Sequence, residues 1–572
     1  MRLRALGFAL LGLLAACGRD EPAALPQLAT PDALAAHSAE FKREVIKVAD
    51  GVYVAVGFGI ANSILLEGDD GVIVVDTMET AESARAVLAE FRKLTDKPVK
   101  ALIYTHSHPD HIGGAGVFAQ GAGGIPIYAQ RRLVANMEKT SIELQTAITR
   151  RSQRMYGTRL SPEGVVNLGV GPFIDLHDGR TVDTLRPTRD FDETLEDNVA
   201  GIRFQLVHAP GETDDHLFVW LPERRILLPG DNVYKAFPNL YTIRGTSYRD
   251  PRAWADSIDR MRALKAAVLL PSHTRPLVGE DLIASTLTDY RDAIRYVYDQ
   301  TLRMINQGRT PDEIAATLKL PAHLAASPML QEFYGTTAWS ARSVFAGNLG
   351  WYDGNPSTLK PLPPDETAQR MVEMAGGVDA LADRIVAAEQ AGEHQWVLQL
   401  SDYLLRVQPD HAAAKQARIA ALRALGEREA NPNARHWYLM TAGELAGEFQ
   451  LPNRILTPTP EMLARMPIAR FFDGMAVNLD AEASGDTVIA VGFEFTDIPQ
   501  RYTYIVRRGV SEVVPDLRSD ADIVVRVSAQ VFKEMLARLR SPGLTIAKDF
   551  EVTKGGKLDF VRFMRLFVPV EA

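Results

Sequence analysis

The sequence predicts an α/β domain, followed by an all-α domain and a small α+β domain. Short apolar runs alternate with helical patterns over residues 45–285. Over residues 286–445 the strand signals fade, and apolar residues recur at three- and four-residue spacing between Pro and Gly breaks, which indicates helices. Over residues 450–572 strand patterns return, some with period-two alternation, beside one amphipathic helix.

Composition and charge place the chain among large globular proteins. It has 572 residues, of which 46% are hydrophobic, enough for several cores. The net charge is −9, and charges of both signs are mixed along the chain. Because no basic stretch stands out, we expect no nucleic-acid partner.

The first residues have the pattern of an export signal. Arg2 and Arg4 precede an apolar run that is too short to remain as a membrane-spanning helix. The run ends in Leu-Ala-Ala-Cys17, which resembles a bacterial lipobox and implies lipidation of Cys17, the chain's single cysteine. A plain secretory signal is the alternative. We expect residues 1–17 to be a lipoprotein signal peptide, residues 18–44 an Ala/Pro-rich linker, and the protein to be lipid-anchored in the periplasm or cell envelope.

The densest group of metal-binding side chains lies in the turn Thr-His-Ser-His-Pro-Asp-His, residues 105–111. It contains His106, His108, Asp110 and His111, and it follows a predicted buried strand, Val99–Tyr104. Histidine and aspartate are poor choices for a buried apolar turn, whereas imidazole and carboxylate are the usual ligands of Zn²⁺. The turn therefore predicts a transition-metal site where a strand ends.

This turn, with the Gly-Gly that follows it, resembles the metallo-β-lactamase superfamily. The resemblance implies an αββα sandwich over residues 45–285, with further metal ligands at later strand ends. Glu212, Asp231 and His273 each follow an apolar run and fit this expectation, although superfamily members usually carry histidine where Glu212 stands. A surface glutamate, a turn aspartate and a core histidine are the respective alternatives.

The resemblance implies two metal ions, with the ligands divided between them. His106, His108 and Glu212 are expected on one ion, Asp110, His111 and His273 on the other, and Asp231 between them. Such a pair generates hydroxide near neutral pH and binds an oxyanion, so Asp110 and Asp231 count as catalytic. Asp76 is either a residue that orients a ligand histidine or a strand-end cap. His216 is expected not to be a ligand.

Glu212 matches the alkyl sulfatase branch of the superfamily. The resemblance extends through segments 151–157, 240–245, 350–356 and 431–439 and covers most of the chain from about residue 45. It implies two Zn²⁺ per chain and hydrolysis of alkyl sulfate esters to alcohol and sulfate by a metal-activated water.

Four residues are expected to contact the substrate. Arg244 and Tyr156 are candidates to hold the sulfate, since a guanidinium matches tetrahedral oxyanions and a phenol donates one further bond. A core Arg–carboxylate pair and an ordinary half-buried tyrosine are the alternatives. Asn62 and Asn232 are expected to line the pocket. No histidine follows Arg244 where the family's general acid is expected, and C–O and S–O cleavage both stay open.

The other two regions also resemble parts of alkyl sulfatases. Residues 286–445 correspond to the region that dimerises, although a helical domain that only packs on the catalytic unit fits too. Residues 396–405 and 412–425 resemble one tetratricopeptide-like helix pair. Residues 450–572 are similar to sterol-carrier-like domains, with structural packing and lipid delivery as the two alternatives.

Two other functions compete with the alkyl sulfatase prediction. One is a different metallo-β-lactamase-fold hydrolase, such as a lactamase, lactonase or phosphodiesterase. The other is a non-catalytic, lipid-binding envelope lipoprotein with a decayed metal site, which a complete ligand set disfavours.

Overall fold

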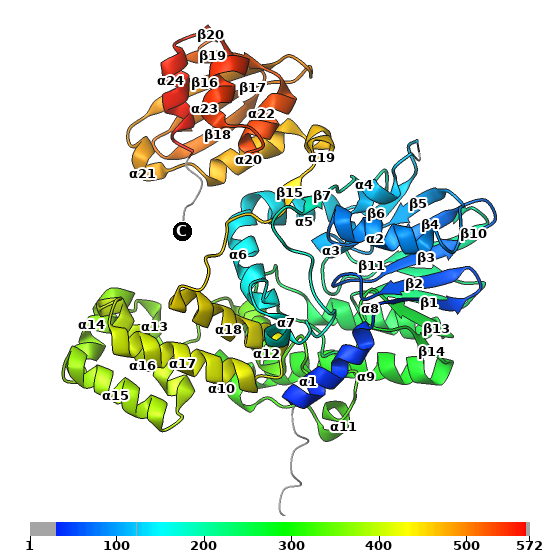
Figure 1. The fold of residues 1–572 in the computed structure, drawn as a ribbon, viewed down its shortest axis with the longest axis horizontal. Helices are drawn as coiled ribbons and strands as arrows, with labels where there is room; N and C mark the ends of the chain where they lie inside the picture. Colours follow the sequence, from blue (N-terminus) through cyan, green and yellow to red (C-terminus); the bar gives the residue numbers. More distant parts are fainter. Residues whose placement is uncertain (1–29, 122, 568–572) are drawn as a thin grey trace, which may run out of the picture.

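Two β-sheets lie face to face in the first half of the molecule, with helices on both outer faces (Figure 1). The computed structural model describes residues 30–121 and 123–567. This arrangement is the αββα sandwich that the sequence predicts. A helical region and a smaller α+β region follow it along the chain, which confirms the predicted order of fold types.

The first sheet has seven strands in the order β1-β2-β3-β4-β5-β6-β8. Neighbours from β1 to β4 are antiparallel, and neighbours from β4 to β8 are parallel. The strands are β1 Glu44–Ala49, β2 Val52–Val56, β3 Ser63–Glu67, β4 Val72–Val75, β5 Val99–Ile103, β6 Ile127–Gln130 and β8 Arg189–Phe191.

The second sheet has six strands in the order β14-β13-β12-β11-β10-β9. All its neighbours are antiparallel except β12 and β13. As a result β10, β12 and β13 run in the same direction and end at the same edge. The strands are β9 Thr194–Val199, β10 Ile202–His208, β11 Leu217–Leu221, β12 Ile226–Gly230, β13 Val268–Pro271 and β14 Leu277–Val278.

Apolar side chains on successive residues point to opposite faces of each strand, and this alternation fixes the register of the strands. On β3, Ile64 and Leu66 pack in the core between the sheets, with Phe204 of β10, whereas Leu65 packs against the outer helices. Burying each such side chain contributes about 1.5–3 kcal/mol. A slip of one residue would exchange the two faces, so this pattern also fixes where each strand ends and its loop begins.

Helices cover both outer faces of the sandwich. The first sheet is covered by α2 Ala81–Phe91, α3 Pro109–Ile112 and α4 Ala115–Phe118. The second is covered by α8 Pro251–Ala263 and α9 Glu280–Asn306. The domain boundary expected near residue 285 falls inside α9. Ile283 lies before it and Leu287 and Tyr290 lie after it, and all three are buried in the core beneath the second sheet, so the sandwich continues past residue 285.

The linker expected over residues 18–44 is not what the structure has from residue 30 onward. There the chain forms α1 Pro31–His37, the 3-10 turn η1 Ser38–Phe41, and the start of β1. Leu34 is buried in a cluster with Met155 and Tyr234. Thr30 caps the helix, and Pro31 occupies its first turn, where proline is favoured. In the sequence alone, proline in this Ala/Pro-rich segment is equally typical of a linker. Cys17 and the expected signal peptide lie outside the described residues.

The long connection between β6 and β8 carries several short elements. They are α5 Leu133–Glu138, the π-helical turn η2 Lys139–Glu143, α6 Gln145–Tyr156, α7 Pro162–Val165 and β7 Thr181–Val182. β7 pairs with β15 Thr457–Pro458, which joins the sandwich to the start of the last region.

The helical region lies beside the sandwich (Figure 1). Its helices are α10 Pro311–Thr317, α11 Ala322–Ala325, α12 Thr337–Leu349, α13 Pro356–Leu359, α14 Pro364–Met374, α15 Val378–Gln390, α16 His394–Val407, α17 Ala412–Arg428 and α18 Pro432–Ala446. The expected helix pair corresponds to α16 and α17, which share a core with α14 and α15.

The last region contains a five-stranded sheet in the order β18-β17-β16-β19-β20, with helices against it. Aromatic rings, among them Phe472, Phe493 and Phe532, fill its interior. Its elements are α19 Pro460–Arg465, α20 Ile468–Val477, α21 Ala481–Ser484, β16 Val488–Phe495, β17 Arg501–Arg507, β18 Val510–Pro515, β19 Ile523–Val527, α22 Ala529–Leu536, α23 Pro542–Asp549, β20 Glu551–Lys554 and α24 Lys557–Met564. Among the described helices of the whole chain, none has the length and apolarity needed to span a bilayer.

Candidate metal centre

The predicted ligands come together where the two sheets meet. Strands β5, β10, β12 and β13 all end at this edge, and a hydrogen bond from Leu217 N to Thr105 O, 2.9 Å long, ties one sheet to the other there. Each ligand therefore sits in the first turn after a buried strand. The strands leave little freedom in the position of these turns.

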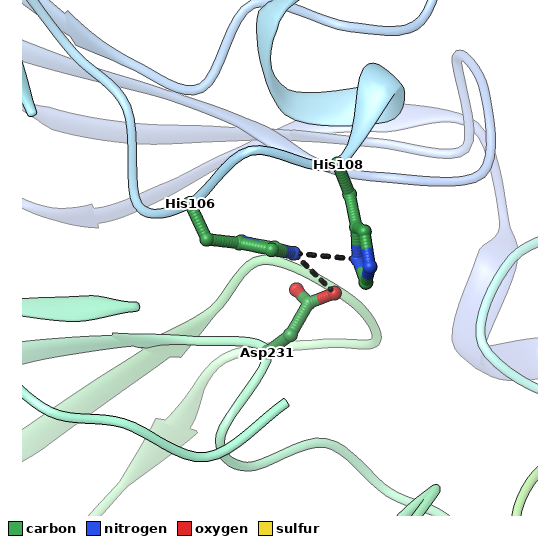
Figure 2. Close-up of side chains that lie close together, drawn as sticks. All are labelled: His106, His108 and Asp231. Atoms are coloured by element: carbon green, nitrogen blue, oxygen red, sulfur yellow. Dashed lines mark hydrogen bonds and ion pairs between the residues drawn. The ribbon is translucent and has the colours of Figure 1, made fainter. Parts of the chain in front are cut away.

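One group of candidate ligands consists of His106, His108 and Asp231 (Figure 2). His106 Nε2 lies 2.8 Å from His108 Nδ1 and 3.5 Å from Asp231 Oδ2. The donor atoms of the three residues lie within 4.8 Å of one another, close enough to surround one cation.

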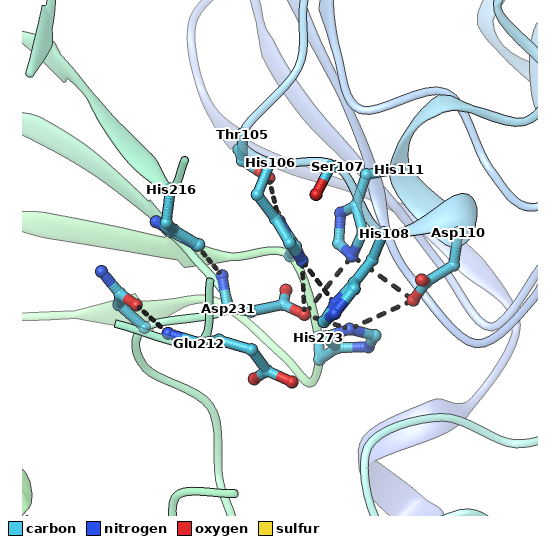
Figure 3. Close-up of polar contacts among 12 residues, drawn as sticks. Thr105, His106, Ser107, His108, Asp110, His111, Glu212, His216, Asp231 and His273 are labelled. Carbon is cyan, nitrogen blue, oxygen red and sulfur yellow. Dashed lines mark hydrogen bonds and ion pairs between the residues drawn. The ribbon is translucent and has the colours of Figure 1, made fainter. Parts of the chain in front are cut away.

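The second group consists of Asp110, His111 and His273 (Figure 3). Asp110 Oδ2 lies 3.3 Å from His111 Nε2 and 3.6 Å from His273 Nε2. His111 and His273 come from different sheets, after β5 and β13. This group therefore spans the interface between the two halves of the sandwich.

Asp231 lies between the two groups. Its Oδ2 atom is 3.5 Å from His106 Nε2, 3.3 Å from His111 Nε2 and 3.1 Å from His273 Nε2. Burial alone raises the pKa of this carboxyl group, but the surrounding imidazoles hold it well below its usual range. An ionised carboxylate in this position reaches both groups, as expected of a bridging ligand.

The donor set fits divalent metal ions. Buried Asp231 Oδ1 has no hydrogen-bond partner among the described residues, and His111 Nε2 faces the carboxylates of Asp110 and Asp231 without a hydrogen bond of good geometry. An unpaired buried polar atom costs about 1–3 kcal/mol, so such atoms normally have a partner. Imidazole nitrogens and carboxylate oxygens that converge in this way are what a transition-metal cation requires.

Two of the candidate ligand histidines also form a hydrogen bond through the ring nitrogen that faces away from the site. His111 Nδ1 lies 2.8 Å from Asp76 Oδ2, and His273 Nδ1 lies 2.8 Å from Ile60 O. Asp76 accepts further bonds from Thr105 and Ser272, and its φ of +60° is a strained backbone conformation for a residue other than glycine. These contacts give Asp76 the orienting position, which is one of the two roles that the sequence leaves open.

Glu212 is in neither group, although the sequence places it with His106 and His108. Its Oε1 accepts a bond of 2.8 Å from Arg249 Nη1, and Tyr234 OH lies 3.4 Å from its Oε2. The Glu212 and Arg249 side chains are only 3% and 1% exposed. The buried guanidinium thus supplies Glu212 with a charge-assisted bond. Sequence reasoning missed Arg249, because nothing in the local pattern marks an arginine just before a helix as buried.

His216 also lies outside the two groups. Its Nε2 accepts a bond of 2.9 Å from the backbone N–H of Asp231, and burial lowers its pKa to about 3. A neutral imidazole therefore supports the Asp231 turn, in keeping with the expected non-ligand role. Gly230 makes this approach possible, because a Cβ there would lie 2.5 Å from the His216 ring and φ is +59°.

Arg244 and Tyr156 lie beside the first group. Arg244 Nη2 is 3.1 Å from His108 Nε2, and the Tyr156 hydroxyl lies near the Arg244 guanidinium. Tyr156 OH also lies 3.3 Å from the OH of Tyr334, a buried residue of the helical region that has no local sequence signal. Two of the four expected substrate-binding residues are thus at the site with polar groups directed toward it.

Asn62 and Asn232, which are expected to line the pocket, form hydrogen bonds with the backbone of neighbouring loops. Asn62 Nδ2 donates to Pro271 O and Thr274 O, at 3.1 and 2.7 Å. Asn232 Oδ1 accepts from Glu212 N at 3.1 Å, and its Nδ2 donates to Ala209 O at 2.7 Å. Both residues are buried, and their amides hold the backbone of the loops that carry His273 and Glu212.

Replacing Asp76 with Asn should weaken metal binding by about 10- to 100-fold, as is typical when the partner of a ligand histidine is lost. The amide loses the negative charge that holds the ring of His111 in place. Competition with a chromogenic chelator measures the affinity. Metal affinity equal to that of the wild type, in a folded variant, would show that Asp76 is only a strand-end cap.

Three family models match the chain in succession. They are described as metallo-beta-lactamase superfamily for residues 56–273, alkyl sulfatase dimerisation for residues 310–448, and alkyl sulfatase C-terminal for residues 456–571. Together they cover the three regions of the fold in their observed order.

Curated relatives and a solved structure give the same result. The chain is 37% identical to a linear primary-alkylsulfatase of Pseudomonas sp. (strain ATCC 19151), over 88% of this chain and 98% of that protein. It is 32% identical to an alkyl/aryl-sulfatase of Saccharomyces cerevisiae, over 91% and 82%. The structure of a stereoselective inverting sec-alkylsulfatase from Pseudomonas sp. matches with a TM-score of 0.84 and 28% identity, over 92% and 85%. The chain therefore belongs to the alkyl sulfatase family, whose catalytic region has the metallo-β-lactamase fold.

Proposed function

We propose that this protein is a zinc-dependent hydrolase that converts alkyl sulfate esters to alcohol and sulfate. The observation that carries the proposal is the position of Arg244 beside the metal-binding groups. A guanidinium at 3.1 Å from His108 Nε2 places an anion-binding side chain directly next to the candidate metal centre. Family membership supports the same reaction class, because the similar proteins are named as alkylsulfatases.

The ligand chemistry supports zinc as the metal and two ions per chain. Four imidazoles and two carboxylates form the two groups, and nitrogen and oxygen ligands of this kind suit Zn²⁺. When bound, such a pair of cations supplies hydroxide near neutral pH and positive charge for an oxyanion. Asp231 holds the two groups together through one oxygen, and Asp110 completes the second group.

The sulfate is held by Arg244 and Tyr156 in this proposal. Arginine presents a planar set of donors that matches a tetrahedral oxyanion. Burial raises the pKa of Tyr156, so the phenol keeps its proton and serves as a donor. Because the Tyr156 hydroxyl lies near the Arg244 guanidinium, both donors approach the sulfate from the same side.

The purified, metal-loaded protein should hydrolyse dodecyl sulfate, and a chelator should abolish the activity until zinc is restored. Released sulfate, measured by ion chromatography, gives the rate. Nitrocefin, lactones and aryl phosphates serve as a comparison panel for the competing hydrolase functions. Activity toward a member of that panel but not toward alkyl sulfates would reject the proposal, as would dodecyl sulfate turnover that a chelator leaves intact.

The helical region supports a second part of the proposal, a homodimer. Its described residues between 349 and 374 expose an unusual series of large apolar side chains. They are Leu349 at 56%, Trp351 at 73%, Leu359 at 54%, Leu362 at 47% and Met374 at 75%. This stretch lies within residues 310–448, which match the alkyl sulfatase dimerisation model. Large apolar side chains exposed in one segment favour a protein interface, so we assign residues 349–374 to contact with a second copy.

The double substitution Trp351→Ser and Leu359→Ser should convert a dimer to monomers, because it removes apolar area from the contact. Light scattering after size exclusion measures the mass. Leu558→Ser is the matched control, since Leu558 is 74% exposed in the last region and should leave the dimer intact. A wild-type monomer, or a dimer that survives the double substitution, contradicts the assignment.

We also propose that the protein is exported and anchored in the periplasm or cell envelope through a lipid on Cys17. The Leu-Ala-Ala-Cys17 sequence after a short apolar run supports this. Labelled palmitate should enter the wild-type protein in a bacterial host but not the Cys17→Ser variant. Absence of label from both proteins refutes the anchor.

A further inference from the structure

Helix α6 of the sandwich packs against helix α18 of the helical region. Arg154 on α6 forms a two-pronged ion pair with Glu444 on α18, at 2.7 and 2.9 Å. Buried His436 of α18 lies with its Nδ1 3.0 Å from Met155 O, next to Tyr156. The end of α6 that carries Tyr156 is therefore held by the helical region.

Arg151, one turn earlier on α6, reaches in another direction. Its Nε donates to Arg244 O at 2.8 Å, and its Nη2 donates to Ile243 O at 2.5 Å. Its guanidinium lies over the ring of Trp437 on α18, 5.3 Å from the ring centre. Arg151 thus connects α18 to the backbone of the loop that presents Arg244.

The loop over residues 240–245 has no regular structure to hold it. Gly245 has φ of +108°, so the chain turns sharply directly after Arg244. Two consecutive carbonyls that point at one planar guanidinium fix the direction of this turn, because backbone acceptors without a partner are costly. The backbone direction at this point sets the position from which the Arg244 side chain extends.

We propose that Arg151 is a positioning residue for sulfate binding, held on Trp437, which fixes the loop that presents Arg244. This inference rests on the proposed function, because it takes Arg244 as the residue that binds sulfate. Arg151 acts through this loop, because its guanidinium donates to the carbonyls of Arg244 and Ile243. It makes the affinity for sulfate esters depend on how the helical region packs against the sandwich.

A further set of contacts shows that α18 supports the same end of the site in a second way. Asn431 and Asn433, at the start of α18, donate from Nδ2 to Tyr334 O at 3.1 and 3.0 Å. The OH of Tyr334 then lies 3.3 Å from the OH of Tyr156. Arg244, through Arg151, and Tyr156, through Tyr334 and α6, therefore both depend on one helix.

Arg151→Met should raise KM for dodecyl sulfate, and the inhibition constant of inorganic sulfate, by roughly 10- to 100-fold, because small displacements of a binding group have effects of this size. The change in kcat should be smaller, and the metal content should stay at the wild-type value, since Arg151 touches neither ligand group. Arg151→Lys keeps the charge and part of the hydrogen bonding, and it should give an intermediate KM.

Arg154→Met is the matched control. Arg154 lies on the same helix and bonds to the same partner helix, but its ion pair is with Glu444 rather than with the Arg244 loop. Its KM should rise much less than that of Arg151→Met, because Arg151 still holds the Arg244 loop and His436 still lies against the end of α6 that carries Tyr156. Equal KM changes in the Arg151 and Arg154 variants would show that Arg151 only docks α6, and so would an unchanged KM in Arg151→Met.

Hydrogen exchange separates this inference from the proposed function. Amides of residues 241–246 should exchange faster in Arg151→Met and Arg151→Lys than in Arg154→Met. If the wild type does not hydrolyse alkyl sulfates, the proposed function fails, and exchange in this loop still decides whether Arg151 holds it. Unchanged exchange in both Arg151 variants overturns the inference.

Discussion

The sharing of one oxygen, Asp231 Oδ2, among three imidazoles is the interaction on which the site depends. His106 and His111 come from the first sheet, whereas Asp231 and His273 come from the second. A buried carboxylate is tolerated only when it is paired, so neither half of the sandwich can keep its charged groups there without the other. The core between the sheets and the metal centre at their edge therefore stabilise the same arrangement.

Near Asp231, the buried carboxylates of Asp76 and Glu212 also have specific hydrogen-bond or ion-pair partners. Asp76 takes its bonds from Thr105, Ser272 and the ring of His111, and Glu212 is paired with Arg249. Removal of one member of a buried pair such as Glu212 and Arg249 costs about 3–5 kcal/mol. Such pairing fixes the Asp76 and Glu212 carboxylates beside the candidate metal ligands.

The parts of this site that the sequence predicts are those with a local signal. The turn with His106, His108, Asp110 and His111 follows an apolar strand directly, and Asp231 and His273 likewise end apolar runs. Strand direction then brings them together. The strands β18 and β20 of the last region were not predicted, because they are half exposed and lack a clear apolar alternation. Helix α1 was not predicted, because proline at its start is also typical of a linker.

Contacts between distant segments have no such signal. Arg249, Tyr334 and Arg151 join the site through contacts with residues far along the chain, and single-residue types give no hint of burial. Asn62 and Asn232 are expected from the family resemblance to line the pocket. In the structure their side chains supply partners for buried loop carbonyls and amides, a role that has no local sequence signal.

Anomalous X-ray scattering from crystals of the zinc-loaded protein, measured on both sides of the zinc absorption edge, tests the central claim most directly. The account predicts two peaks about 3.5–4 Å apart, the usual spacing of a two-metal site, with Asp231 between them. One peak should lie beside His106 and His108, and the other beside Asp110, His111 and His273. A single peak, or zinc bound away from Asp231, would contradict the account.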